Sequence, residues 1–150
     1  MNASECNIQA VGWQDASEAL RDIREKVFIH EQRVPFYLEW DGLDPNAIHF
    51  LVRDSNQSPV GCSRLLSDGQ VGRVAVLERL RRQGIGHALM QFVIRYAEEH
   101  AYPDLFLHSQ VSAQAFYEAL GFVAYGDVYE EAGIQHISMK RTDSTVGQKV

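Results

Sequence analysis

The segment from Val74 to His87 constrains this chain more than any other part of its sequence. A Val-x-Val run that is typical of a strand leads into a short basic loop, and Gly84 and Gly86 then open a helical pattern. A helix N-terminus carries free backbone N–H groups and the positive end of the helix dipole. It can bind phosphate where glycine lets the backbone come close. The segment therefore predicts a site for a phosphate-bearing ligand.

The same residues also fit a helix start without a ligand, in which Arg79, Arg81 and Arg82 face water. Two glycines in a first turn cost about 1 kcal/mol each relative to alanine, which favours a function for them. Other phosphate motifs fit less well, because GxxxxGK[ST] is absent and the GxGxxG spacing fails after Gly86. The sequence thus favours an anionic ligand at this loop over either of those nucleotide sites.

The hydrophobic period predicts strands before this segment and helices with strands after it. The expected strands are 7–13, 47–53, 60–66, 71–77, 105–108, 122–129 and 136–140. The expected helices are 83–100, 112–120 and an earlier one that is capped by Asp15 or Ser17 and ends near Glu31. Early antiparallel strands followed by alternating strands and helices predict an α/β (α+β) fold, with a mixed sheet covered by helices.

Composition narrows the classes of partner. The formal net charge of −6 argues against broad binding to nucleic acid, which needs a basic face. No apolar run reaches the ~18 residues of a membrane span, and residues 1–6 lack the pattern of a secretory signal. Cys6 and Cys62 form no CxxC pair, and Cys/His clusters are absent. We therefore expect a cytoplasmic protein with reduced thiols, no metal, and no nucleic-acid or membrane partner.

Two stretches together resemble the motifs of the GNAT superfamily of acyl-CoA N-acyltransferases. The first is the Arg-x-x-Gly-x-Gly sequence at residues 81–86, which follows the Val-x-Val strand. The second is residues 110–122, which are similar to Asn-x-x-Ala-x-x-x-Tyr-x-x-x-Gly-Phe. Its residues in register are Ala113, Tyr117, Gly121 and Phe122. The resemblance implies the GNAT fold, with a central mixed, mostly antiparallel sheet, as one domain over 1–141 and a flexible tail over 142–150.

A narrower resemblance extends over the rest of the chain. Segments at residues 27–35, 41–44, 49–50 and 136–139 are similar to the ElaA-type subgroup of small bacterial acyltransferases. The substrates of that subgroup are poorly defined, so this resemblance names no acceptor. Gln110 departs from the superfamily pattern because Asn is commoner there, which weakens the case for its hydrogen bond to the cofactor. Glu78 replaces a usual proline.

The resemblance implies where acetyl-CoA, the co-substrate, would lie. The strand at 71–77 would splay from the next strand at a bulge, and main-chain groups of Val74 and Val76 would pair with the pantetheine amides. Tyr117 would act as the general acid that protonates the departing thiolate. Packing on the sheet beside Phe116 is the alternative for this residue. The expected cofactor-binding residues are Val74, Ala75, Val76, Arg81, Arg82, Gln83, Gly84, Ile85, Gly86, His87, Gln110 and Tyr117.

The acceptor side of the site is less defined by the sequence. By the same resemblance Glu31, Trp40 and Asp41 border the acceptor, which we expect to be a small-molecule or peptide amine. The aromatic run at residues 36–40 fits an acceptor pocket and packing of the first helix equally well. The general base stays open among Glu31, Glu39, Asp41, His108 and a chain of waters.

Two functions follow from these residues. The first is an enzyme that transfers an acyl group directly from acetyl-CoA to an amine in a ternary complex. A covalent route through Cys62 is disfavoured, because the sequence offers it no evident His–acid partner. The second is a non-catalytic acyl-CoA-binding sensor or interaction module. Homodimer formation is compatible with either function.

Overall fold

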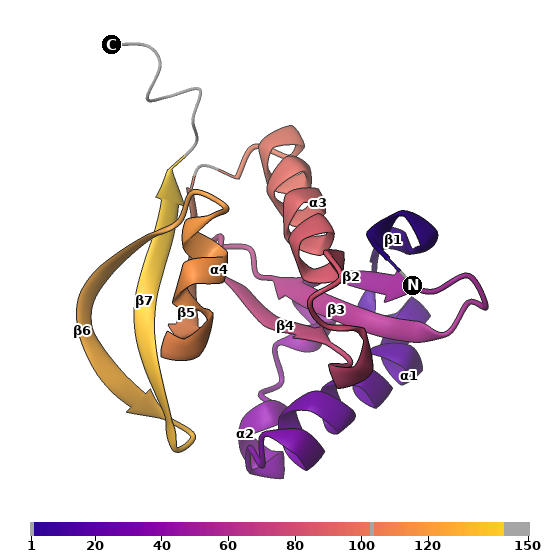
Figure 1. Cartoon of the computed structure of the whole chain (residues 1–150), viewed down its shortest axis with the longest axis horizontal. Coiled ribbons are helices and arrows are strands. Elements are labelled where there is room, and N and C mark those ends of the chain that lie inside the picture. The colour runs from indigo at the N-terminus through magenta and orange to yellow at the C-terminus, as the bar shows by residue number, and fades with distance from the viewer. Residues whose placement is uncertain (1, 103, 143–150) are drawn as a thin grey trace.

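The protein is described by a computed structural model covering residues 2–102 and 104–142 (Figure 1). Its strands are β1 (Asn7–Val11), β2 (Ile48–Arg53), β3 (Pro59–Leu65), β4 (Val71–Val76), β5 (Asp104–Gln110), β6 (Val123–Glu131) and β7 (Ile134–Thr142). Its α-helices are α1 (Trp13–Arg24), α2 (Phe36–Glu39), α3 (Ile85–Glu99) and α4 (Gln114–Glu118). Of the tail predicted at 142–150, Thr142 ends β7 and the rest lies outside the described residues.

The strands form two antiparallel sheets in place of one continuous mixed sheet. The first has the order β1-β2-β3-β4, and the second has the order β5-β7-β6. A single parallel bridge between Gln70 and Phe106 joins them where β4 and β5 begin. The sheets diverge beyond this bridge, so the mixed character predicted from the sequence is confined to one contact. Figure 1 shows the two sheets side by side, with α4 beside the second.

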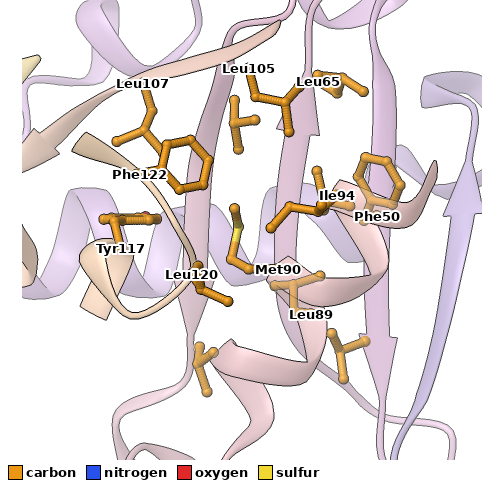
Figure 2. Packing of buried hydrophobic residues seen from close by; sticks show 14 of the residues in the cluster. Phe50, Leu65, Leu89, Met90, Ile94, Leu105, Leu107, Tyr117, Leu120 and Phe122 are labelled. Atoms are coloured by element: carbon orange, nitrogen blue, oxygen red, sulfur yellow. The ribbon is translucent and has the colours of Figure 1, made fainter. Parts of the chain in front are cut away.

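Helices α1 and α3 cover opposite faces of the first sheet, because successive residues of a strand point to opposite faces. Phe50 and Val52 of β2 pack in the cluster that contains α3, whereas Leu51 packs in the cluster that contains α1. The larger cluster continues under the second sheet. There Leu107, Tyr117 and Phe122 meet Met90 and Leu120 (Figure 2). Each fully buried side chain of this size contributes roughly 1.5–3 kcal/mol.

The first helix differs from its prediction at both ends. It begins at Trp13, after the N-cap Gly12, and not at a cap on Asp15 or Ser17. Ala16 has non-helical angles, so the helix is kinked within its first turns. Beyond Arg24 the chain continues as a π-helical segment, Glu25–Glu31, which matches the predicted end near Glu31. The aromatic run that follows forms the single turn α2.

Candidate active site

A pocket of about 980 Å³ lies where the two sheets diverge. This volume is at the upper end of the range for small-molecule sites. Its walls come from β4, β5 and β7, from the loop before α3, from α4, and from the segment around α2. Of the predicted site residues, those that line it are Asp41, Val74, Ala75, Val76, Arg81, Arg82, Gly84, Gly86, His87, Gln110 and Tyr117. The structure thus brings most of the predicted cofactor-binding residues to one cavity.

Strand β4 carries a bulge at the divergence. Strand β3 pairs Cys62 with Ala75 and Arg64 with Gly72, so two β4 residues lie opposite one β3 residue. One of the two, Arg73, has a positive φ of 53°. A bulge bends its strand and ends regular pairing locally. The predicted splay of this strand from the next one is therefore present, and the bulge accounts for it.

Beyond the bulge, the outer edge of β4 faces the pocket. Leu77 N–H donates to Val60 O of β3 at 3.0 Å. Because alternate residues of a strand direct their backbone groups to the same neighbour, Ala75 also faces β3, while Val74 and Val76 face the open side. Arg81 Nε donates to Val76 O at 2.9 Å from that side. Strand β4 is thus the edge strand of its sheet, and an extended amide chain could add to this edge.

The N-terminus of α3 lies at one end of this edge. Gly84 is its N-cap, in the left-handed conformation with φ of 85°. The first helical hydrogen bond runs from Ala88 N–H to Gly84 O, so the amides of residues 85–87 precede the helical ladder and are available to an anion. The Ile85 side chain is buried in the core, and the Gln83 side chain does not line the pocket. These two residues can serve a ligand through their backbone.

Arg81 does not extend freely toward a phosphate. It makes a bidentate ion pair with Glu31, at 2.6 and 2.7 Å, which ties the end of the π-helical segment to the loop before α3. The hydrogen bond with Arg81 lowers the pKa of Glu31, and the same bond raises the pKa of Arg81. A residue predicted for the cofactor and one predicted for the acceptor are thus paired. Glu31 itself does not line the pocket.

Tyr117 is a packed residue and also a residue of the pocket wall. Its ring lies against Phe116 and Phe122, with centroids 4.9 and 5.9 Å away, and it is 8% exposed. Burial raises the pKa of Tyr117, so the phenol keeps its proton at neutral pH. Nearby, Gln110 Nε2 donates to Gln32 Oε1 at 2.9 Å. The predicted general acid and the predicted packing role are compatible in one residue.

Three arginines and three carboxylates form a charge-balanced network at the other end of the pocket. We call it the arginine–carboxylate network; its members are Arg24, Glu39, Asp41, Asp44, Arg64 and Arg73. Its shortest contacts are Arg24 to Asp44 at 2.7 Å and Arg24 to Glu39 at 2.8 Å. Sequence reasoning missed this network. The only available signal was the density of acids at residues 39–44, whose arginine partners are distant in the chain.

The carboxylates of the network differ in how readily they bind a proton. Burial raises the pKa of Glu39, despite the arginines around it. Burial also acts to raise the pKa of Asp41, but hydrogen bonds from Arg64 and the Leu43 amide outweigh it and bring the pKa to about 2. Asp41 is therefore a fixed anion at neutral pH, held by Arg64 through two bonds of 2.9 Å.

Comparison with known proteins identifies the family to which this architecture belongs. The model of the acetyltransferase (GNAT) domain family matches residues 13–142. The chain belongs to the GNAT acetyltransferase family. Protein ElaA of Escherichia coli K12 is 32% identical over 87% of this chain and 96% of its own length. This similarity supports the predicted ElaA-type subgroup.

Solved GNAT structures have the same fold. The crystal structure of an acyl-CoA N-acyltransferase from Pseudomonas aeruginosa aligns with a TM-score of 0.83 and 33% identity, over 91% of this chain and 99% of that one. The crystal structure of Escherichia coli ElaA aligns with a TM-score of 0.82 and 30% identity, over the same shares. GNAT enzymes use acetyl-CoA as co-substrate and act on small-molecule or peptide amines.

The aromatic run of this GNAT chain divides between packing and exposure. Trp40 does not line the pocket, because Arg21 and Arg24 lie over its ring at 5.2 and 4.8 Å and hold it against α1. For Trp40 the structure thus favours packing over the acceptor role that the sequence suggested. Phe36 and Tyr37 are 65% and 76% exposed and lie outside the pocket lining.

The second sheet contributes a histidine-rich wall to the GNAT pocket. His108 of β5 and His136 of β7 line it, and Tyr129 of β6 contacts both. His108 Nδ1 is hydrogen-bonded to the Tyr129 hydroxyl. The Tyr129 ring stacks on His136, with centroids 5.9 Å apart. Of the base candidates open in the sequence, His108 and the network residues Glu39 and Asp41 line the pocket.

Two further observations concern membranes and metals. No helix within residues 2–102 and 104–142 is long and apolar enough to cross a membrane. The same residues contain no group of three or more His, Cys, Asp or Glu side chains placed to hold a metal ion. The expectation that the site works without a metal stays a prediction.

Proposed function

We propose that this GNAT chain transfers the acetyl group of acetyl-CoA to an amine by direct attack in a ternary complex. The observation that carries the proposal is the pocket that runs from the N-terminus of α3, along the open edge of β4, to the space between the histidine wall and the arginine–carboxylate network. One end suits a pyrophosphate, and a second substrate would enter at the other.

The residues at the first end fit coenzyme A. The amides of residues 85–87 and the side chain of Arg82 can bind the pyrophosphate. Gly84 and Gly86 leave room for it to approach. Val74 and Val76 offer backbone groups to the amides of the pantetheine arm, as an added strand would use them. The thioester then lies deeper in the divergence between the sheets.

The reaction needs few groups from the protein. The amine nitrogen bonds to the thioester carbonyl carbon, the carbon–sulfur bond breaks, and the sulfur leaves as a thiolate that takes a proton from Tyr117. The nitrogen loses a proton as the amide forms, and water returns a proton to Tyr117. Direct attack is favoured over an acyl-cysteine intermediate. Cys62 is 1% exposed, and burial raises its pKa to about 12, which suppresses the thiolate that a nucleophile requires.

The acceptor in this proposal is a small-molecule or peptide amine. Its side of the pocket combines apolar side chains such as Leu38, Leu43 and Ile134 with the fixed charges of Asp41 and Arg73. An amine with both an apolar part and a polar group matches that lining. Cytoplasmic location and homodimer formation stay predictions from the sequence.

An acyl-CoA sensor is the alternative, and two measurements on the same protein separate it from an enzyme. Calorimetry measures CoA binding, and a thiol reagent follows CoA release from acetyl-CoA with a panel of primary amines. We expect saturable binding together with thiol release that increases with amine concentration. Binding without amine-dependent release would support the sensor, and absence of CoA binding would contradict both functions.

A further inference from the structure

His108 lies close to the point where the two sheets separate. The parallel bridge between Gln70 and Phe106 marks that point, and Gly72 and His108 are two residues further along their strands. The α3 N-terminus lies beyond Val76, four residues along β4 from Gly72, or roughly 13 Å in an extended strand. An acyl-pantetheine arm that enters from the helix end and follows this edge brings its thioester toward Gly72 and His108.

A hydrogen bond to Tyr129 orients the His108 ring. Tyr129 is bonded to His108 Nδ1, and Ser138 also hydrogen-bonds the phenol. Burial raises the pKa of Tyr129, so it is a neutral phenol at neutral pH. Its oxygen can accept from Nδ1–H and also from the Ser138 hydroxyl, whose hydrogen bond acts to lower the pKa of Tyr129 as a donor's does. With Nδ1–H as the donor to Tyr129, Nε2 carries a lone pair.

The other base candidates are committed to ion pairs. Glu31 is held by both terminal nitrogens of Arg81 and does not line the pocket. Asp41 accepts two hydrogen bonds from Arg64, and Glu39 is buried against Arg24. His108 is exposed in the wall of the pocket, and no salt bridge to it is found among the described residues.

We propose that His108 is the general base that deprotonates the acceptor amine, and that Tyr129 is its positioning residue. The inference rests on the proposed acyl transfer. The His108 Nε2 lone pair takes a proton from the protonated acceptor amine, and the freed lone pair of the nitrogen then bonds to the thioester carbon. The sulfur leaves with the electron pair of the carbon–sulfur bond and receives its proton from Tyr117. Imidazolium then gives its proton to water, and Tyr117 regains a proton from the product nitrogen through water, so that atoms and charges balance.

Titratable and charged groups that contact His108 or line the same pocket come from several elements. Tyr129 and Glu131 belong to β6, and His136 belongs to β7, with its Nε2 3.8 Å from Glu131. Asp41 and Arg73 line the same pocket from the arginine–carboxylate network. His136 is the nearest rival. Its Nδ1 lies 2.7 Å from the Ile134 carbonyl, which would also leave Nε2 as an acceptor.

The test compares His108→Gln with the parent in thiol-release kinetics at saturating acetyl-CoA. Benzylamine, or the best strongly basic primary amine of the panel, serves as acceptor. We expect kcat to fall about 10²–10⁴-fold with little change in CoA affinity. The acid limb of the parent pH profile should disappear, leaving a rate that rises with pH as free amine accumulates. His100→Gln is the matched control, because His100 caps the far end of α3 and its ring is hydrogen-bonded to the Tyr96 carbonyl.

Two further measurements separate base catalysis from a structural role. With aniline, which is already neutral at neutral pH, the loss in His108→Gln should shrink to under about tenfold. Added imidazole should restore part of the rate to His108→Ala and leave His100→Gln unchanged. Tyr129→Phe should lower kcat about 10-fold or more, within the range for loss of a residue that orients a catalytic histidine.

Specific results would overturn the inference. One is a kcat of His108→Gln within about threefold of the parent. Another is an equal loss of kcat with benzylamine and with aniline. A third is a pH–rate profile whose acid limb disappears in His136→Gln but remains in His108→Gln. If the parent released no thiol with any amine, the proposed function would fall together with the inference. An active parent with an unaffected His108→Gln would refute the inference alone.

Discussion

Tyr117 illustrates how one residue can serve both packing and chemistry. Its ring contributes to the core beside Phe122 (Figure 2), and the same side chain lines the pocket. A buried phenol remains protonated, which a general acid requires, although its raised pKa makes proton transfer less favourable. The two roles can be separated by removing the hydroxyl and keeping the ring.

Tyr117→Phe should lower kcat about 10²–10⁴-fold, because the thiolate would lose its proton donor. Stability and CoA affinity should change little, since the ring contacts remain. Steady-state thiol release at saturating acetyl-CoA, with a calorimetric Kd for CoA, measures both effects. Turnover within about threefold of the parent would remove Tyr117 from the mechanism, because that factor is less than 1 kcal/mol of barrier.

The Glu31–Arg81 ion pair makes a second residue-scale prediction. Glu31→Gln should tighten CoA binding several-fold, because it releases the Arg81 cation and removes a negative charge near the phosphate loop. Arg81→Ala should weaken CoA binding by about 1–3 kcal/mol. Calorimetry at low and high salt measures both. Unchanged affinity in Arg81→Ala would assign Arg81 to holding Glu31 and not to binding phosphate.

This pair also shows where sequence reasoning stops at the residue scale. Each residue was found separately, from the glycine-loop motif or from the subgroup resemblance, but they lie 50 positions apart. Nothing in the sequence indicates that they meet. The same limit applies to the arginine–carboxylate network, because Arg24 and Arg64 reach their partners only through the packing of α1 and β3.

At the scale of elements, the N-cap of α3 offers a test in which the effect of backbone strain can be distinguished from the effect on CoA binding. Gly84 has φ of 85° and Gly126 has φ of 75°, and a side chain is strained at either position. Gly84→Val and Gly126→Val should therefore each lose roughly 1–2 kcal/mol of stability. Only Gly84→Val should weaken CoA binding strongly. Urea unfolding and calorimetry measure the two effects, and equal CoA affinity in both variants would contradict the phosphate loop.

Gly86 is a less clean position for the same test. An added Cβ would lie 3.5 Å from the Phe116 ring and 3.8 Å from Val76, so alanine fits there but the branches of valine would crowd the ring. A loss of CoA affinity in Gly86→Val would mix displacement of Phe116 with obstruction of the phosphate. Gly86→Ala avoids the crowding.

The hydrophobic periodicity of the sequence predicted the strands and helices but not the division of the strands into two sheets. The strand meander and the long helix followed from the alternation of apolar residues, and their ends agree within about two residues. The division into two sheets depends on the bulge at Arg73, where an ordinary side chain adopts a positive φ. Only the family resemblance indicated that divergence. The residues at the start of α1 were predicted to be strand, because the N-cap Gly12 lacks the capping side chain that signals a helix start in a sequence.

At the scale of the whole molecule, the arginine–carboxylate network connects α1, α2, β3 and β4 behind the acceptor end of the pocket. Its carboxylates come from a short segment that regular strand pairing does not hold. Breaking one buried pair leaves a partner charge uncompensated, which costs about 3–5 kcal/mol. The network therefore fixes the acceptor wall relative to the sheet.

The arginine–carboxylate network predicts how the stability of the fold changes at low pH. The pKa of Asp41 is lowered to about 2 in the folded protein, from about 3.9 when unfolded. Its contribution is fully present above the unfolded value and is lost as the pH falls from about 4 to about 2. Asp41→Asn should therefore be much less stable than the parent at neutral pH, with a smaller difference near pH 2.

Urea midpoints at neutral pH and near pH 2 measure this difference. Asp127→Asn, at an exposed carboxylate of β6, is the matched control and should stay close to the parent at both pH values. A difference between parent and Asp41→Asn that is the same at both pH values would show that the Asp41 charge does not stabilise the fold.

Initial rates of thiol release, measured over a matrix of acetyl-CoA and amine concentrations, test the central claim most directly. Direct transfer in a ternary complex predicts release that depends on both substrates, with double-reciprocal lines that intersect. Parallel lines would indicate a covalent acyl-enzyme and contradict direct attack. Release that is independent of every amine, despite saturable CoA binding, would contradict acyl transfer to an amine altogether.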